Sequence, residues 1–139
     1  MIESFIKITH DAYKKHFKKD FGGVIPAIFT DEPNFRTKKT LNFAADKHGI
    51  VIPYTTDFDK TFRDAYGISI EDHLPVLVWE PADGIPSRIR YWYHDHITER
   101  FAEAFCDTVG KWCEENGILM TGHLLNEPTL GSQTVCVGD

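Results

Sequence analysis

The chain has 139 residues and a net charge of -6, and 42% of its residues are hydrophobic and 13% aromatic. This composition is typical of a folded globular domain and excludes wholesale disorder, and the negative charge argues against nucleic acid as a partner, because phosphate binding depends on clustered lysine and arginine. No run approaches the ~20 apolar residues that a membrane helix needs, so we expect no membrane partner.

The first predicted element is an amphipathic helix over residues 2–19, which ends at Gly22 and Gly23. A solvated helix face explains its basic residues more simply than a polyanion site does; these residues are Lys14, Lys15, Lys18 and Lys19. Residues 24–29, VIPAIF, then indicate a short buried parallel strand. Because Pro26 cannot donate to a sheet ladder, it must sit at an edge or where its nitrogen faces away from a neighbour.

Mixed charge without a sustained period follows this strand, and we expect a long loop there. Residues 57–66 and 69–78 then predict two short helices, the second of which begins with Ser69 and Asp72 in a capping arrangement. We expect these helices to form an insertion after the first strand, at about residues 57–80.

The strongest periodic pattern of the chain predicts a long amphipathic helix over residues 87–116, with Gly117 as its C-terminal cap. Residues 118–123, ILMTGH, then indicate a second buried strand, which is followed by the polar stretch LLNEPTL. The order helix, glycine, apolar strand and acid-proline pair therefore occurs twice.

The chain has three cysteines, Cys106, Cys113 and Cys136, and the first two lie seven residues apart on one predicted helix, too far along its axis to be bridged to each other. No cysteine or histidine spacing of the zinc-binding kind occurs, so we interpret all three as packing residues. The first residues, MIESFIKITH, lack the pattern of a secretory signal peptide. We therefore expect a reducing compartment, the cytoplasm.

Polar side chains follow both predicted strands: Asp31 and Glu32 come after the first, and His123, Asn126 and Glu127 end or follow the second. In parallel α/β folds, residues at the carboxyl ends of the strands gather around one crevice. Glycoside hydrolysis ordinarily uses two carboxyl groups on opposite sides of the bond that breaks. Two strands that each deliver an acid can supply this pair.

An acid-proline pair after a strand is also common in exposed loop starts, and Glu80-Pro81 occurs away from any strong strand signal. We interpret Glu80 as a turn residue. The catalytic interpretation of Glu32 therefore depends on the second acid, Glu127.

The segments VIPAIFTDEP, YGISIEDHLPVL and RIRYWYHDHITERFAEAFCDTVGKWCEENGILMTGHLLNE resemble bacterial barrel glycosidases of the α-L-rhamnosidase-like and related glycosyl hydrolase groups. The resemblance covers about residues 9–139, and its most specific part is the long helix followed by WCEENGI and TGH. It implies an α/β fold, namely part of a (β/α)8 barrel with a few βα units and a helical insertion after the first strand. We expect one domain over residues 1–139.

The resemblance also implies roles for the residues at the strand ends. Glu32 matches the acid of the TDEP motif and Glu127 the acid after Gly-His. We expect Glu32 to be the general acid and Glu127 the base or nucleophile, with no cofactor or metal. Asp31, His123 and Asn126 are expected to bind the carbohydrate substrate, and the first two of them also to tune the acidity of the carboxyl groups.

Aromatic side chains offer candidate platforms for a sugar ring. Tyr91, Trp92 and Tyr93 stand at the start of the long predicted helix, where packing explains them better. Trp79 lies between predicted helices and is the better candidate for contact with the substrate.

A complete barrel of this type takes about 250 residues, so we expect this chain to be a fragment of one. It is a truncated remnant, one piece of a longer enzyme, or a chain whose copies cover the exposed strand edges in a homo-oligomer. Two alternatives stay open. One is a catalytically inactive protein that binds carbohydrate or only dimerises. The other is a metal-dependent hydrolase that uses His123 with Asp31, Glu32 and Glu127. His94 and His96 are not metal ligands in this interpretation, because side chains two apart on a helix point in different directions.

Overall fold

The computed structural model describes residues 1–35, 39, 41–79, 82, 84, 85, 87–125 and 129–131. These residues group into two compact units. Unit 1 combines Met1–Asn34 with Glu99–Val137, and unit 2 is formed by Phe35–Thr98. Each unit has a hydrophobic cluster of its own.

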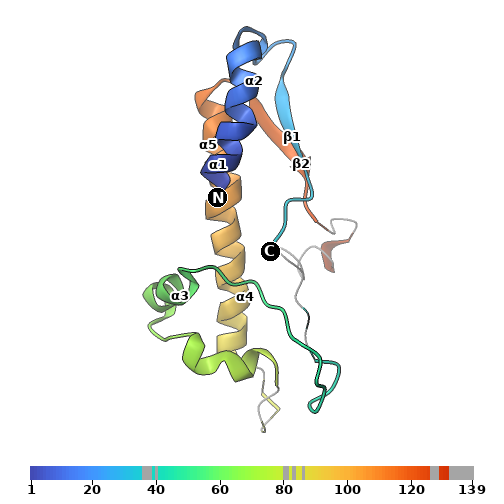
Figure 1. Ribbon diagram of the computed structural model, residues 1–139, viewed down its shortest axis with the longest axis vertical. Coiled ribbons are helices and arrows are strands. Elements are labelled where there is room, and N and C mark those ends of the chain that lie inside the picture. The colour runs from blue at the N-terminus through green and yellow to red at the C-terminus, as the bar shows by residue number, and fades with distance from the viewer. Residues whose placement is uncertain are drawn as a thin grey trace. The chain divides into compact units, whose positions relative to one another are not determined.

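Unit 1 is built from helices and a two-stranded sheet (Figure 1). Its elements are α1 (Ile2–Ile8), α2 (His10–Phe17), the 3-10 helix η1 (Lys18–Asp20), β1 (Ala27–Asp31), the π-helical segment η3 (Ala102–Asp107), α5 (Thr108–Glu115) and β2 (Leu119–His123). The predicted helix over residues 2–19 is present but breaks at Thr9, whose hydroxyl donates to the Phe5 carbonyl at 2.7 Å. Such bonds from a Thr side chain to the preceding turn bend helices.

Strand β1 begins three residues later than the sequence pattern predicts. Pro26 lies just before it and contributes only its carbonyl oxygen, which accepts from the Leu119 amide at 3.0 Å. The missing N–H of Pro26 therefore costs the sheet no ladder hydrogen bond.

The two strands pair in parallel, with Ala27 opposite Leu119 at one end and Asp31 opposite His123 at the other. Alternate side chains of a strand point to opposite faces. Ile28 and Met120, which are partners in the register, pack on the cluster of unit 1. The buried members of this cluster are Ile6, Val109, Cys113 and Ile118. One face of the sheet is thus covered by the helices of unit 1.

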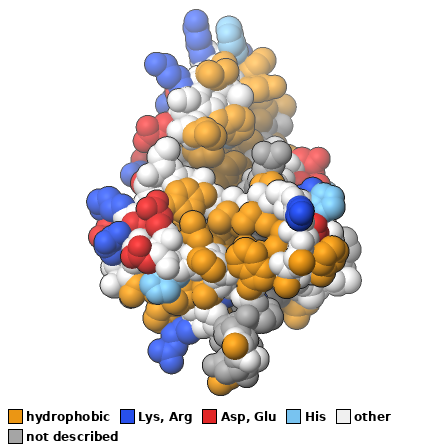
Figure 2. All heavy atoms as spheres, turned by 60° about the horizontal axis from the view of Figure 1, so that its bottom comes forward, with side chains coloured by type: hydrophobic (Ala, Val, Ile, Leu, Met, Phe, Trp, Pro, Cys, Tyr) orange, Lys and Arg blue, Asp and Glu red, His pale blue; other side chains and the backbone are white. Residues whose placement is uncertain are grey.

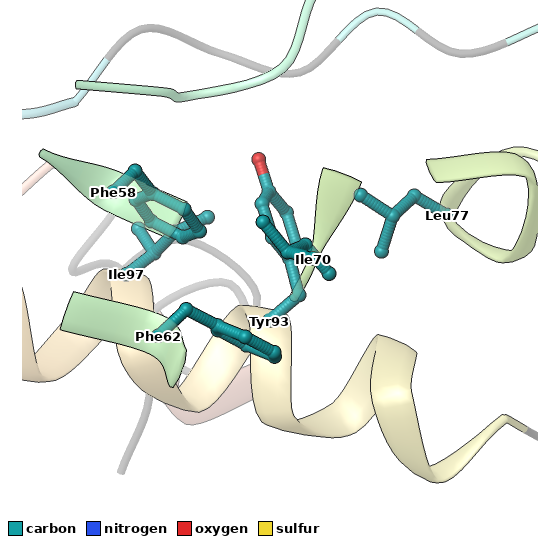
Figure 3. Close-up of a cluster of buried hydrophobic side chains, with 6 residues drawn as sticks. All are labelled: Phe58, Phe62, Ile70, Leu77, Tyr93 and Ile97. Carbon is teal, nitrogen blue, oxygen red and sulfur yellow. The ribbon is translucent and has the colours of Figure 1, made fainter. Parts of the chain in front are cut away.

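Unit 2 contains α3 (Phe58–Tyr66), the 3-10 helix η2 (Glu71–Leu77) and most of α4 (Arg88–Phe101). Figure 3 shows side chains from these three segments and from Ile70, just before η2, meeting in one cluster. Its buried members are Phe58, Phe62, Ile70, Leu77, Tyr93 and Ile97. The centres of the Phe58 and Tyr93 rings are 5.5 Å apart. The Tyr93 hydroxyl donates to the Pro53 carbonyl at 2.6 Å, so its polar end is satisfied.

Helix α3 ends at Gly67, which adopts the left-handed conformation with φ 75°, as predicted. The start of η2 differs from the prediction, because no side chain of its own first turn caps it. Asp59 of α3 takes this role, since one of its carboxylate oxygens accepts from the Ser69 hydroxyl at 2.6 Å and from the Ile70 amide at 2.8 Å.

Several large apolar side chains of unit 2 remain exposed outside its cluster, and Figure 2 shows hydrophobic side chains gathered on the face turned toward the viewer. The most exposed are Phe43, Ile85 and Tyr91, each at about two thirds of its full area: 65%, 65% and 67%. Part of the apolar side chains of unit 2 therefore lies at its surface, outside the cluster.

The predicted long helix is confirmed, because α4, η3 and α5 follow one another without a gap over residues 88–115. Its middle segment, Ala102–Asp107, is π-helical. Gly117 follows with φ 66°, the left-handed conformation of a C-terminal cap.

The expected partial (β/α)8 barrel is wrong. The described residues form a helix-rich chain with a single two-stranded parallel sheet, in which β1 and β2 pair with each other. The reason is that the apolar residues between the strands, such as Phe58 and Phe62, pack in a helical cluster and form no further barrel strand. Contacts group the described residues into two compact units, and the expected single domain over residues 1–139 stays a prediction. Among the described residues, no helix has the length and apolar character needed to cross a membrane.

A candidate carboxylate and histidine site at the strand ends

The carboxyl ends of β1 and β2 lie side by side in unit 1 (Figure 1) and bring two of the predicted site residues together. Asp31 is the last residue of β1 and His123 the last of β2, and they are partners in the register. Asp31 Oδ1 lies 3.6 Å from His123 Nδ1. Asp31 and His123 lie opposite each other because the register begins with Ala27 opposite Leu119 and both strands have the same length beyond that pair.

Glu32 follows this pair and has an unusual backbone. Its φ is 45°. Among the described residues, Glu32 alone is a non-glycine residue with a positive φ. Its amide donates to the His123 carbonyl at 3.1 Å, and its own carbonyl accepts from Asn34 Nδ2 at 2.9 Å. A left-handed conformation costs a residue with a Cβ about 1 kcal/mol or more, and such strain concentrates at functional sites. Glu32 is therefore held in a costly conformation by hydrogen bonds on both sides.

Gly122 allows the two strands to approach closely at this end. A Cβ added to it would lie 2.0 Å from the Thr30 carbonyl oxygen and 2.6 Å from the Thr30 hydroxyl. Only glycine fits at that position. The close approach brings His123 and Asp31 level with each other, since both are one residue further along their strands.

The side chains of the Asp31 and His123 pair are open to solvent. The Asp31 side chain is 75% exposed and that of His123 57% exposed, and Glu32 is also exposed. The His123 ring contacts the Phe29 ring edge to face, with 5.0 Å between their centres and 84° between their planes. A solute can therefore reach two carboxylates, an imidazole and an aromatic ring at one end of the sheet.

The remaining predicted site residues are Asn126, Glu127 and Trp79. Asn126 and Glu127 lie outside the described residues. Trp79 belongs to unit 2, where its side chain is partly exposed and its indole N–H donates to the Ala44 carbonyl at 3.2 Å. The pairing of Glu32 with Glu127 stays a prediction.

The described residues contain no group of three or more histidine, cysteine or acidic side chains that could hold a metal ion. His96 is buried in unit 2, where its ring packs on Phe58 and Phe62 and its Nε2 lies 2.8 Å from the Thr61 hydroxyl. His96 is thus a packing histidine.

Sequence reasoning missed Phe29, Thr30 and Gly122 as parts of this end of the sheet. A signal for Gly122 was present, because glycine inside an apolar strand often marks a close backbone approach. Phe29 gave no such signal, since a phenylalanine in an apolar run predicts a buried side chain.

Comparisons with protein-family models, curated proteins and solved structures found no match to this chain.

Proposed function

We propose that the chain takes part in the hydrolysis of O-glycosidic bonds, with Glu32 as one of the two acids. The observation that carries this proposal is the strained conformation of Glu32, held by the His123 carbonyl and by Asn34 directly after the Asp31 and His123 pair. A strained backbone at the end of a parallel strand is explained if it holds the Glu32 carboxyl group in the position that the reaction needs.

The chemistry needs two carboxyl groups. One donates a proton to the leaving oxygen as the glycosidic bond breaks, and the other takes a proton from the attacking water or itself attacks the anomeric carbon. In this proposal Glu32 is the proton donor, Glu127 is the base or nucleophile, and Asp31 and His123 bind sugar hydroxyls. Asn126 would add a neutral hydrogen-bonding group.

The test is turnover of a panel of aryl glycosides that includes an α-L-rhamnoside, measured for the wild type and for Glu32→Gln and Glu127→Gln. Each glutamine keeps the shape of the side chain but can neither donate the carboxyl proton nor act as a base, so each single variant should lose turnover. Glu114→Gln is the control, because Glu114 is an exposed acid on α5 of the same unit. Wild-type rates for Glu32→Gln would contradict the proposal.

A second candidate is a carbohydrate-binding protein without catalysis. The exposure of Asp31 and His123 favours it, because exposed polar side chains can bind hydroxyls, whereas solvent screens exposed charges and weakens the electrostatic stabilisation that catalysis needs. Binding of sugars by the wild type together with zero turnover on every glycoside would favour this candidate over hydrolysis.

Location and assembly are part of the proposal. Cys106 and Cys113 are free thiols, which suits a cytoplasmic location. A homo-oligomer would cover the outer edges of β1 and β2, each of which has its paired neighbour on one side in the described sheet. The metal-dependent alternative has no observed ligand group in the part of the chain that is described, and loss of turnover on chelation would revive it.

A further inference from the structure

Phe29 has an exposure that packing does not explain. It lies in the middle of β1, and its side chain is 56% exposed, although parallel strands usually have both faces covered. Its strand neighbour Ile28 packs on the cluster of unit 1, whereas Phe29 faces the opposite side of the sheet. The observed ring contact of Phe29 is with His123, a member of the candidate site.

Phe29 shares its face with the polar groups of the site. Asp31 is two residues further along β1, and Thr121 and His123 are the register partners of Phe29 and Asp31. Residues two apart on a strand point to the same face and lie about 6.6 Å apart. An aromatic ring, a hydroxyl, a carboxylate and an imidazole therefore occupy a patch of the size of one six-membered sugar ring.

We propose that Phe29 is the stacking platform of this site and that the ligand is a neutral pyranoside with one apolar C–H face. The inference rests on the proposed function and adds a binding residue and a ligand class to it. The C–H face of the sugar packs on the Phe29 ring, while Asp31 and Thr121 bind hydroxyls at the rim. The aromatic ring and the polar side chains bind different parts of the sugar because a pyranose has an apolar C–H face and polar hydroxyls at its rim.

The charge of the patch excludes anionic sugars. Asp31 and Glu32 are consecutive acids at the strand end, with His123 beside the first of them. A uronic acid would bring a third carboxylate next to these two, and like charges at such distances repel. The site therefore selects a neutral ring over its carboxylated counterpart.

The experiment measures binding of methyl α-L-rhamnopyranoside, methyl β-D-glucopyranoside and methyl β-D-glucuronide by saturation-transfer NMR and titration. We expect at least one neutral glycoside to bind and the glucuronide not to bind. Phe29→Ala should weaken binding about three- to tenfold, the range of one aromatic contact. Phe29→Leu should weaken it similarly, and Phe29→Trp should retain it.

Ile8→Ala is the matched control, because Ile8 is a 75% exposed apolar residue of helix α1, which belongs to the same unit and lies outside the sheet. It should bind the glycosides like the wild type, and circular dichroism should report equal folding for all variants. Equal affinity of Phe29→Ala and the wild type would overturn the inference, and so would tighter binding of the glucuronide than of the neutral rings. Wild-type sedimentation as a dimer that Phe29→Ala dissociates would also overturn it, since a second copy would then cover this face.

Failure of this inference can be told apart from failure of the proposed function. If Glu32→Gln loses turnover while Phe29→Ala keeps the wild-type KM, the platform is wrong and the hydrolytic proposal stands. If the wild type neither binds nor cleaves any glycoside, both are wrong.

Discussion

The sharpest structural prediction concerns Gly122→Ala. The added Cβ would lie 2.0 Å from the carbonyl oxygen and 2.9 Å from the carbonyl carbon of Thr30, both of which are backbone atoms that cannot rotate away. The strands must therefore separate by about 1 Å at this end. Overpacking usually costs about 1–3 kcal/mol, and we expect the upper end of that range because no side chain can yield.

The effect is measured as the free energy of unfolding of the whole chain in urea and as the amide hydrogen-exchange rates of unit 1. The Glu32 amide, which donates to the His123 carbonyl, should exchange faster in Gly122→Ala, whereas the Leu119 amide at the other end of the sheet should change less. Gly110→Ala is the control, because Gly110 lies within helix α5 with nothing within 4 Å of an added Cβ. It should stabilise the chain by up to about 1 kcal/mol. An unchanged free energy of unfolding in Gly122→Ala would refute the reasoning.

Three further predictions concern stability. Phe62 is 0% exposed in the unit 2 cluster, so Phe62→Ala should lower the free energy of unfolding in urea by about 3–5 kcal/mol. A loss below about 1 kcal/mol would contradict the packing described. Burial lowers the pKa of His10, against the opposing effect of Asp11, so the stability that its neutral imidazole contributes is fully present above pH 6.5 and is lost as the pH falls. His10→Gln should flatten this dependence in thermal melts, and an unchanged dependence would contradict the burial of His10. Hydrogen bonds from Ser69 and from Arg63 lower the pKa of Asp59 from 3.8 to about 2, so unit 2 should lose stability as the pH falls from 3.8 toward 2. Asp59→Asn should flatten that loss in a fluorescence-detected acid titration, and an unchanged slope would assign the loss to other acids.

Local patterns predicted the helices of this chain well. The period of apolar residues identified the segments that became α3 and the long run of α4, η3 and α5, and Gly67 and Gly117 marked their ends. These signals are readable because a helix bonds within itself and its glycine caps depend on the conformation of one residue. The break at Thr9 was missed, since it depends on one side-chain hydrogen bond that competes with helix geometry.

The candidate site was predictable only in part. The sequence pointed to Asp31, Glu32 and His123 because each follows or ends an apolar strand. It did not reveal the positive φ of Glu32 or the exposure of Phe29, because both depend on which strand lies beside β1 and on which face the helices cover. Asn126 and Glu127 lie outside the described residues, so their part in the site stays a prediction.

The amino-acid sequence by itself thus determined which segments form helices, the glycine ends of α3 and of the long helix, the approximate place of the two apolar strands, and which acids follow them. The tertiary structure alone decided that β1 and β2 pair directly in parallel, that the residues between them build a separate helical cluster, and that Asp59 caps a helix eleven residues further along the chain. The barrel prediction was wrong because it concerned the number and the pairing of strands. The physical reason is that periodicity records which face of a segment is apolar, whereas strand number and partner depend on contacts between segments distant in sequence.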